Sequence, residues 1–219
     1  LNLETGKGGR YDIVLDAKTR GFLASLVPWE GRFESHGWRE KDGRFVPELH
    51  RSTTLSDGDE KEVKEYKYSR AGAFLGLTKT NSKHTGKHKD DDPDDTAPEL
   101  TQGTTDALSA ALDVFQAVAE KKPCEGSSDV FDGSRRFSQA FKDQGTEDLT
   151  PSRYNIFKGE ASQCTVEVVP VAGRWHKKPR GWMSIQEQGR AAGTMPTVWL
   201  ATLHNGAPAV PVKIRVKTA

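Results

Sequence analysis

Hydrophobic and polar residues alternate along most of the first eighty residues, and this period of two predicts β-strands. Tyr11, Ile13 and Leu15 alternate with mostly polar neighbours, and the same rhythm continues from Trp29 to Trp38. Glycine favours short turns because it has no Cβ to clash at positive φ. Such turns separate the runs at Asp42-Gly43, Asp57-Gly58 and Ala71-Gly72. We therefore predict a β-meander, with Pro47 at an edge or a bulge of its strand.

One later segment has helical spacing instead. Apolar residues recur every three or four positions from Leu108 to Ala119, which predicts an amphipathic helix. Thr105 or Asp106 can cap its first turn, and Pro123 ends the pattern. Before this helix, residues 81–103 are rich in charged side chains and lack an apolar period. We expect this segment to be a charged, solvated loop between two halves of the fold.

The strand pattern resumes after the helix. Asn205-Gly206 is the strongest hairpin signal of the chain. Further strands are expected near Arg135–Lys142, Tyr154–Ile156, Cys164–Val169, Met195–Leu203 and Val210–Val216. With about ten strands and one main helix, we predict a mainly β, single domain over residues 1–219. Its architecture is expected to be a curved open antiparallel sheet or half-barrel with the helix on the concave face.

The charge balance narrows the choice of partners. The chain has 32 Lys and Arg against 31 Asp and Glu in 219 residues, so no net field favours nucleic acid. No apolar run approaches the ~20 residues that a membrane-spanning helix needs. We therefore expect neither a nucleic-acid partner nor stable membrane insertion, and no cofactor motif is present in the sequence.

The two cysteines, Cys124 and Cys164, lack the spacing of metal ligands. We expect them to form a disulfide, the alternative being two separate buried thiols. A bridge closing about 40 residues contributes roughly 4 kcal/mol in the chain-entropy model and persists in oxidising compartments. We therefore expect an exported, periplasmic protein whose signal peptide precedes the sequence shown.

Several motifs together resemble a known bacterial family. In chain order they are Phe131-Asp132-Gly133-Ser134-Arg135-Arg136-Phe137, Cys164, Pro170-Val171-Ala172-Gly173, Val198-Trp199-Leu200-Ala201 and Pro211-Val212-Lys213-Ile214. This order resembles the envelope family catalogued as domain of unknown function 3108. The resemblance implies a periplasmic protein with a curved open sheet, similar to periplasmic lipoprotein carriers. Ser134 and Phe137 depart from the more usual Arg and Tyr of the turn motif.

The first candidate binding site is the segment Gly173–Gly193, where basic and aromatic side chains are interleaved. Cations can meet anionic head groups while indole rings prefer an interface, so the segment suits an anionic amphiphile, and its rings also suit sugars. The alternative is a long basic hairpin or loop whose tryptophans cover the core. The candidate residues are Arg174, Trp175, Lys177, Lys178, Arg180 and Trp182.

Two weaker candidates remain. His84, His88 and the carboxylates of Asp90–Asp95 are metal-ligand types, but their spacing matches no known loop and favours a flexible charged segment. Aromatic residues on the concave sheet face are expected either to line a groove for an acyl chain or to form an ordinary core. These aromatic residues are Trp29, Phe33, Tyr66 and Phe74.

No catalytic motif is present: the sequence has neither a Gly-x-Ser-x-Gly elbow, a His-Glu-x-x-His pair nor a phosphate-binding glycine loop. We expect a non-enzymatic periplasmic protein that supports the envelope and binds a lipid, a glycan or another envelope-derived ligand. The main alternative is a scaffold that recruits envelope proteins through exposed strand edges. A hydrolase of cell-wall material is a third interpretation.

Overall fold

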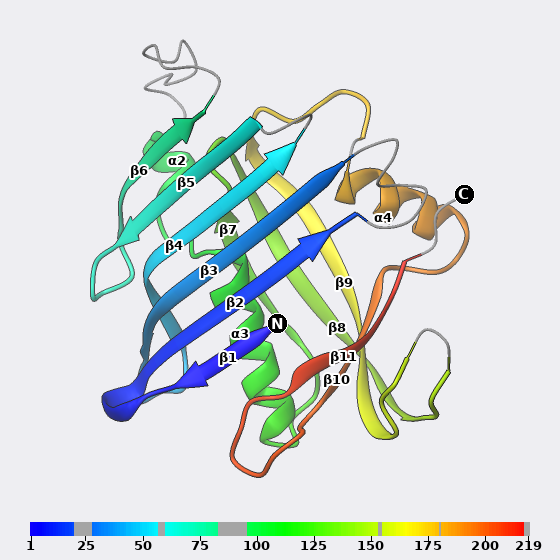
Figure 1. Ribbon diagram of the computed structural model, residues 1–219. Helices are drawn as coiled ribbons and strands as arrows, with labels where there is room; N and C mark the ends of the chain where they lie inside the picture. Colours follow the sequence, from blue (N-terminus) through cyan, green and yellow to red (C-terminus); the bar gives the residue numbers. More distant parts are fainter. Residues whose placement is uncertain (20–27, 57–59, 83–95, 153–154, 180, 217–219) are drawn as a thin grey trace. The chain divides into compact units, whose positions relative to one another are not determined.

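The computed structural model describes residues 1–219 except 20–27, 57–59, 83–95, 153–154, 180 and 217–219. Its strands form two open antiparallel sheets, one of six strands and one of five (Figure 1). The mainly β, open-sheet prediction is confirmed, although the strands are divided between two sheets. The chain forms two compact units: unit 1 is 1–109 with 131–135, and unit 2 is 110–130 with 136–219.

The sheet of unit 1 is a meander in which each strand pairs with the next one in sequence. Its strands are β1 (Asn2–Thr5), β2 (Arg10–Lys18), β3 (Trp29–Arg39), β4 (Phe45–Ser56), β5 (Glu60–Tyr68) and β6 (Phe74–Asn81), with a 3-10 turn, η1 (Lys7–Gly9), between β1 and β2. Gly43 and Gly72 occupy their turns with φ of 94° and 81°. Pro47 lies opposite Gly37 at a register shift, so the predicted bulge is confirmed.

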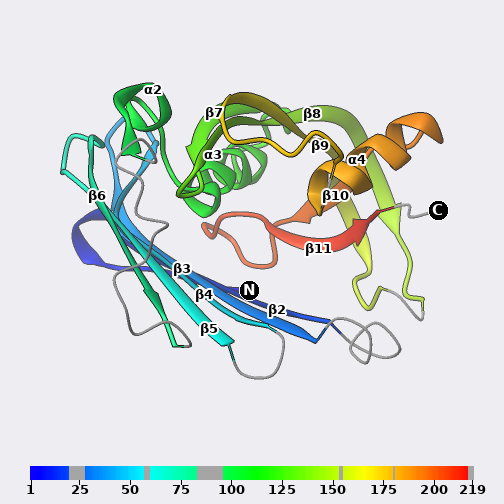
Figure 2. The same ribbon diagram turned by 90° about the horizontal axis from the view of Figure 1, so that it is seen from above.

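The register of these strands defines one face of the sheet. Ile13 lies opposite Ser35, which lies opposite His50, and this row continues to Tyr66 and Leu77. Side chains opposite one another in antiparallel strands point to the same side. We call the side that carries this row the inner face of the sheet. Figure 2 shows β2 to β6 as a single curved layer.

Two helices lie between the sheets in sequence. The short α2 (Pro98–Thr101), which begins with a proline, falls within the segment expected to be a loop. The main helix α3 (Ala107–Ala119) is capped by Asp106, whose Oδ1 accepts hydrogen bonds from the backbone N–H groups of Leu108 (2.9 Å) and Ser109 (3.1 Å). Pro123 follows its end, as predicted.

The end of α3 contains an unusual backbone conformation. Lys121 has φ of 62°, and it is the one non-glycine residue with positive φ in the described chain. The N–H of Lys122 bonds to the carbonyl of Ala117 (2.9 Å) and the N–H of Lys121 to that of Val118 (3.0 Å). This pair of bonds is the Schellman motif, in which glycine is the preferred residue at the left-handed position.

Unit 2 contains most of the second sheet. Its order is β11-β10-β9-β8-β7, and the turn between β7 and β8 belongs to unit 1. The elements are β7 (Gly126–Phe131), β8 (Arg135–Leu149), β9 (Gly159–Gly173), α4 (Trp182–Ala191), β10 (Thr197–Ala201) and β11 (Val210–Arg215). Gly206 turns with φ of 82° between β10 and β11, as its motif predicts.

Unit 2 contains a buried disulfide and a buried tryptophan. Cys124 and Cys164 are bonded and fully buried, with their Cα atoms 5.9 Å apart. Trp199 packs with Leu149, Ala161 and Ala201, and its Nε1 donates to Glu147 (2.7 Å). The expected disulfide is thus present in the structure.

Two expectations for the second half were wrong. Ile156 is not on a strand, and its side chain is 96% exposed. Residues 182–191, expected within a hairpin or loop, form the helix α4. This helix is held by Gln186, whose amide bonds to both the N–H (2.7 Å) and the carbonyl (3.0 Å) of Val168 on β9. In the described chain, no helix is long and apolar enough to cross a membrane.

Candidate functional site

A chain of buried polar side chains crosses the inner face beneath the start of α3. Tyr11, Ser35, His50, Asp106 and Ser109 are all buried. The Asp106 carboxylate accepts from the hydroxyls of Ser35 (2.7 Å) and Ser109 (2.5 Å), in addition to the helix N–H groups. Because the hydroxyl hydrogens of Ser35 and Ser109 are thus used, His50 Nδ1 must donate to Ser35 and Tyr11 to Ser109.

This order of hydrogen bonds differs from that of a hydrolase triad. In a catalytic triad the histidine accepts the serine proton and the carboxylate contacts the histidine's other nitrogen. Here Ser35 donates directly to Asp106, and His50 Nδ1 lies 3.4 Å from the same carboxylate oxygen. Burial lowers the pKa of His50, an effect that the Asp106 carboxylate partly opposes. The arrangement is a satisfied polar core that holds Asp106 and Ser109 on the sheet of unit 1.

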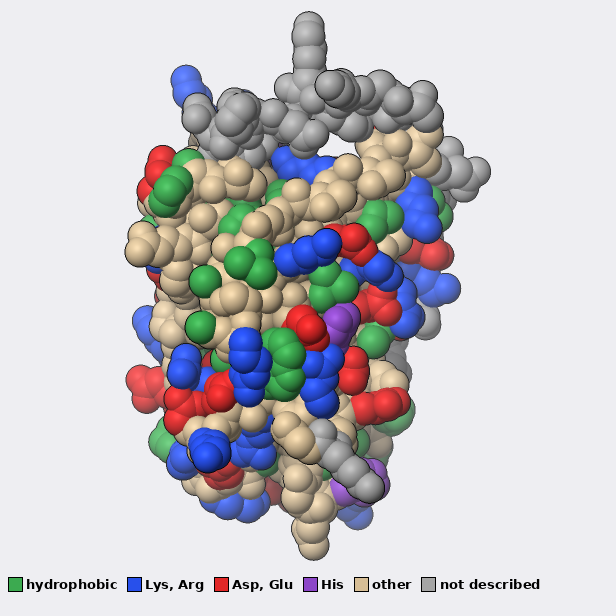
Figure 3. Space-filling model, turned by 90° about the vertical axis from the view of Figure 1, so that its left-hand side faces the viewer, with side chains coloured by type: hydrophobic (Ala, Val, Ile, Leu, Met, Phe, Trp, Pro, Cys, Tyr) green, Lys and Arg blue, Asp and Glu red, His purple; other side chains and the backbone are tan. Residues whose placement is uncertain are grey.

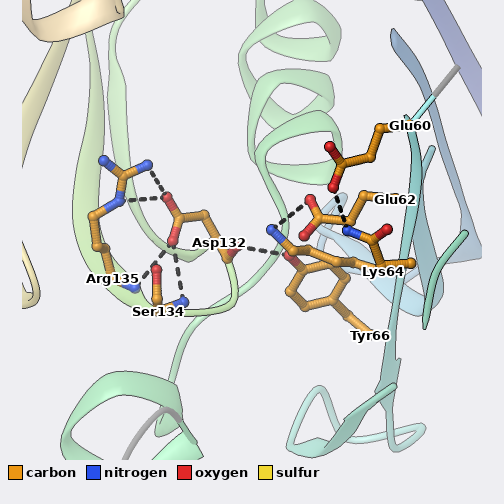
Figure 4. A network of polar contacts seen from close by, with 8 residues as sticks. Glu60, Glu62, Lys64, Tyr66, Asp132, Ser134 and Arg135 are labelled. Carbon is orange, nitrogen blue, oxygen red and sulfur yellow. Dashed lines mark hydrogen bonds and ion pairs between the residues drawn. The ribbon is translucent and has the colours of Figure 1, made fainter. Parts of the chain in front are cut away.

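The turn between β7 and β8 is held on the inner face by Tyr66. The Tyr66 hydroxyl donates to the backbone carbonyl of Asp132 (2.7 Å), and burial raises its pKa well above the usual range. The Asp132 carboxylate accepts from the backbone N–H of Arg135 (3.0 Å) and from its guanidinium (2.8 and 2.6 Å). Figure 4 shows Tyr66 and Asp132 facing each other across this contact.

Packing against the sheet accounts for two residues of that turn, Gly133 and Phe131. Gly133 has φ of 98°, and a Cβ there would lie 3.0 Å from the Tyr66 hydroxyl and 3.4 Å from Leu77. Phe131 is buried and meets Tyr66 and Phe74 edge to face, with ring centroids 6.0 and 5.4 Å apart. Of the four aromatic residues expected on the concave face, Tyr66 and Phe74 therefore belong to the core.

The other two aromatic residues form a separate surface. Gly31 lies between Trp29 and Phe33 on the inner face, and its missing side chain leaves room for the indole ring. A Cβ on Gly31 would lie 2.6 Å from Trp29 and 2.8 Å from Phe33. The two rings are 6.3 Å apart with planes inclined by 34°, and both side chains are half-buried. We call Trp29, Gly31 and Phe33 the aromatic shelf.

A row of hydroxyl groups runs beside the aromatic shelf on the next strand. Ser52 lies opposite Phe33 and Thr54 lies opposite Gly31. Both are half-buried, and neither hydroxyl has a hydrogen-bond partner among the described residues. We call Ser52 and Thr54 the hydroxyl row. Beyond it, Lys64 and Glu62 of β5 form an ion pair (3.0 Å) on the same face, and Figure 4 shows their side chains pointing to the same side of the strand as that of Tyr66.

A hollow of about 860 Å³ lies at the same ends of these strands but on the outer face, because most of its lining residues alternate with those of the aromatic shelf and the hydroxyl row. Two residues of the inner face, Ala17 and Gly31, contribute to its lining. Carboxylate and cationic side chains contribute too, from Asp16, Lys18, Glu30, Arg32 and Lys61. Arg32 and Asp16 are paired (3.0 Å). The charged side chains of the hollow therefore point away from the aromatic shelf.

The sequence-predicted basic segment lies in unit 2, between β9 and α4. Trp175 is half-buried: its Nε1 donates to the carbonyl of Ala172 (2.9 Å), and its ring meets Phe137 edge to face at 6.3 Å. The alternative interpretation, a tryptophan packed on the protein, therefore describes Trp175. Arg174, Lys177 and Lys178 are exposed, whereas Arg180 lies outside the described residues.

Exposed apolar side chains accompany these cations. Trp182 is 37% exposed, Val169 is 43% exposed and Val171 is 53% exposed. Trp182 lies one helical turn before Gln186 on α4, and Gln186 is bonded to β9, so both share the side of the helix that faces the strand. We call Val169, Val171, Arg174, Lys177, Lys178 and Trp182 the basic–aromatic surface.

A scan against protein families matches residues 1–219 to the family DUF3108, described as a protein of unknown function. The chain belongs to this family. No curated protein and no solved structure matches it. The suspected membership is thus confirmed, and it carries no statement about activity.

The family resemblance rests on residues that build the fold. In the motif Phe131–Phe137, Asp132 and Arg135 bond to each other, and Arg136 pairs with Asp129 (2.6 Å). These contacts satisfy the polar groups of the turn, so the motif fixes the start of β8. Sequence reasoning missed the Ser35–His50–Asp106 contacts. The one available signal was that Ser35 and His50 occupy inward positions of an alternating pattern.

Outside the candidate sites, acidic and basic side chains lie close to one another on the surface. On the face shown in Figure 3, basic and acidic side chains are intermingled, and hydrophobic ones are scattered in small groups. Several charged side chains form ion pairs across the sheet of unit 1, including Arg10 with Glu48 (2.8 Å) and Arg51 with Glu65 (2.5 Å).

The candidate metal ligands His84, His88 and Asp90–Asp95 lie outside the described residues. Elsewhere in the described chain, no group of three or more His, Cys, Asp or Glu could hold a metal.

Proposed function

We propose that this member of the family is a non-enzymatic periplasmic protein that supports the envelope by binding an anionic amphiphile. The basic–aromatic surface would carry the contact, with Lys177 and Lys178 meeting the head groups. The observation that supports this most is that exposed cations and exposed apolar side chains occur together there. Residues 173–181 contain no Asp or Glu.

The physical basis is the interface between water and lipid. Indole rings favour that interface, and each Lys or Arg near an anionic surface contributes about 1 kcal/mol. Trp182 and Val171 offer apolar area, and the Trp175 ring holds the loop against Phe137. The anchored loop loses less conformational entropy on binding than a free one would.

Two features support the non-enzymatic and periplasmic parts of the proposal. The Ser35 proton is committed to Asp106, so this serine is not activated by His50, which argues against a hydrolase. The buried disulfide is of the kind that persists in oxidising compartments.

The test is co-sedimentation of the full chain with phosphatidylglycerol vesicles and with phosphatidylcholine vesicles. We expect binding to the anionic vesicles only. Lys177→Glu with Lys178→Glu removes two cations, so the partition constant should fall by at least about 30-fold. Trp182→Ala should reduce it as well. A matched control is Lys41→Glu with Lys67→Glu, which makes the same charge change at exposed positions of unit 1. Equal loss in both pairs, or equal binding to both vesicles, would contradict the proposal.

A second candidate function, the envelope scaffold, is favoured by strand β6. Among the described strands β6 pairs only with β5, so it is an edge of the sheet. Its eight residues include no proline and one charged side chain, Lys79, and Leu75 is 66% exposed. Natural sheets usually protect such edges with charge or proline, because an uncovered edge can pair with another chain.

Crosslinking in cells, followed by purification, tests the scaffold. Leu75→Lys with Thr78→Lys places charges on exposed positions of β6 and should abolish capture of any partner that adds a strand there. Capture of the same proteins by the wild type and this variant would remove β6 from consideration.

A further inference from the structure

We propose that the inner face of unit 1 holds a second, independent binding site, and that it takes an oligosaccharide. The site consists of the aromatic shelf (Trp29, Gly31, Phe33) and the adjoining hydroxyl row (Ser52, Thr54). It lies in a different unit from the basic–aromatic surface, and it does not depend on the vesicle binding proposed above.

The chemistry of this face changes in a regular order from strand to strand. At the same level along the strands, β2 presents Leu15, β3 presents Phe33, β4 presents Ser52 and β5 presents Lys64. Across the face, an apolar side chain on β2 is therefore followed by an aromatic ring on β3, a hydroxyl group on β4 and a charged group on β5. An ordinary core would be apolar across all four strands, because buried polar groups without partners are costly.

This order of side chains matches the apolar face and the polar edge of a sugar ring. A pyranose ring has an apolar face of C–H groups, which stacks on aromatic rings, and an edge of hydroxyl groups. The hydroxyls of Ser52 and Thr54, which have no partner among the described residues, stand beside the aromatic shelf, where they can bond to that edge. The ion-paired Lys64 and Glu62 add a strong donor and a strong acceptor on the next strand.

An acyl chain fits this site less well than a sugar does. An alkyl chain gains by removal from water on all sides, which requires an enclosed apolar channel. Trp29 and Phe33 are half-buried, and the strands beside them on the same face carry the hydroxyls of Ser52 and Thr54 and the charged groups of Lys64 and Glu62.

Gly31 is the residue that makes the aromatic shelf. Its absent side chain lets the Trp29 indole lie across β3 toward Phe33. Alanine at this position leaves every aromatic ring in the protein but places a methyl group 2.6 Å from the indole, so the indole must move. The backbone of Gly31 is not in the left-handed region, so the substitution tests the surface without straining the strand.

The experiment is titration calorimetry of the full chain with two soluble probes, cellotetraose and the β-1,4-linked tetramer of N-acetylglucosamine. We expect at least one tetramer to bind, with Trp29→Ala and Gly31→Ala each weakening it by about tenfold. Ser52→Ala with Thr54→Val should weaken it by about fivefold. Gly76→Ala is the matched control: this glycine of β6 has open space at its Cβ, so binding should be unchanged.

Three results would overturn the site. The first is that neither tetramer binds at millimolar concentration. The second is that the Trp29→Ala and Gly31→Ala variants, each shown to be folded by its melting curve, bind as tightly as the wild type. The third is that laurate displaces the tetramer and binds more tightly, which would make the site an acyl site. The Lys177→Glu and Lys178→Glu pair should leave tetramer binding unchanged, so failure of the vesicle proposal is distinguishable from failure of this one.

Discussion

The two units of this protein build their centres with different chemistry. Unit 1 contains no cysteine and places a hydrogen-bonded chain from Tyr11 to His50 beneath the start of α3. Unit 2 contains both cysteines, joined in a buried disulfide, and a buried tryptophan, Trp199, that bonds to Glu147. Both units are built on open antiparallel sheets. They differ in the buried contacts that hold them together, which are hydrogen bonds in unit 1 and a disulfide in unit 2.

The comparison shows how each unit responds to its surroundings. A disulfide depends on the redox potential of the compartment, whereas a polar network depends on pH and on complete pairing of every member. The two units also present different surfaces: an aromatic and hydroxylated inner face in unit 1, and an exposed basic loop in unit 2. Stability and recognition should therefore be separable by substitutions in either unit.

The largest expected effect is on unit 2. Cys124→Ser with Cys164→Ser removes a bridge across a sequence separation of 40 residues. In the chain-entropy model this costs about 4 kcal/mol of unfolding free energy. Urea denaturation of the variant and of the oxidised wild type measures it. A loss below about 1 kcal/mol would mean that the disulfide does not stabilise this unit.

The corresponding substitution in unit 1 is Asp106→Asn. It replaces a buried carboxylate that accepts four hydrogen bonds with an amide that brings donors of its own. We expect a loss of about 3 kcal/mol, since hydrogen bonds to a charged group are strong and an unpaired buried donor is costly. Asp42→Asn, which changes an exposed carboxylate paired with Arg44, is the control and should cost less than about 1 kcal/mol.

The docked turn gives a smaller effect with a close control. Gly133→Ala combines positive φ with a Cβ 3.0 Å from the Tyr66 hydroxyl, so we expect about 2–3 kcal/mol of destabilisation. Gly43 has a similar φ of 94° and open space at its Cβ, so Gly43→Ala should cost about 1 kcal/mol. Thermal melts of both variants separate the contact from the backbone strain. Equal losses would mean that Tyr66 does not constrain the turn.

The pH dependence of unit 1 should follow His50. Burial lowers its pKa below the ordinary value of 6.5, so the unfolded chain takes up the proton first as pH falls. The stability that neutral His50 contributes is present above pH 6.5 and is lost as pH falls below it, by up to about 1.4 kcal/mol per pH unit. Asp106, which faces His50, limits this loss, and the neighbouring Tyr66 ring is neutral throughout the range.

His50→Gln tests this sign. Urea unfolding at pH 7 and pH 5 should show a smaller difference in the variant than in the wild type. The same loss of stability in both proteins would assign the acid sensitivity to other groups.

The smallest predicted effect is a gain. Lys121 ends α3 at φ of 62°, a conformation that costs a non-glycine residue about 1 kcal/mol. Lys121→Gly should therefore raise the unfolding free energy by about 0.5–1 kcal/mol. Lys122→Gly, next in sequence and outside the left-handed region, should not stabilise the protein. A destabilised Lys121→Gly variant would show that the lysine side chain contributes more than its backbone costs.

Local patterns predicted much of the fold because they act over a few residues. Alternation located β2, β3 and β5, and the cap at Asp106 and the turn at Asn205-Gly206 carry their own chemistry. The helix α4 escaped prediction because it depends on distant contacts. Gln186 bonds to Val168 on β9, and Gly189 lies so close to Thr194 that a Cβ would be 2.4 Å from its carbonyl oxygen.

The candidate sites divide in the same way. The basic segment was visible as composition, since Arg174, Lys177 and Lys178 are close in sequence. The aromatic shelf depends on strand register and on the position of the Trp29 indole over Gly31, and neither can be read from one sequence. Ser35 and Asp106 are separated by 71 residues, so only the fold brings them together.

The central claim is that the two units bind different ligands. Amide chemical-shift mapping of the full isotope-labelled chain tests it most directly, with the carbohydrate tetramer and phosphatidylglycerol bicelles added in separate titrations. The account predicts shifts near residues 29–33 and 52–54 with the tetramer, and near 169–182 with the bicelles. Shifts of the same residues in both titrations, or none at these positions, would contradict it.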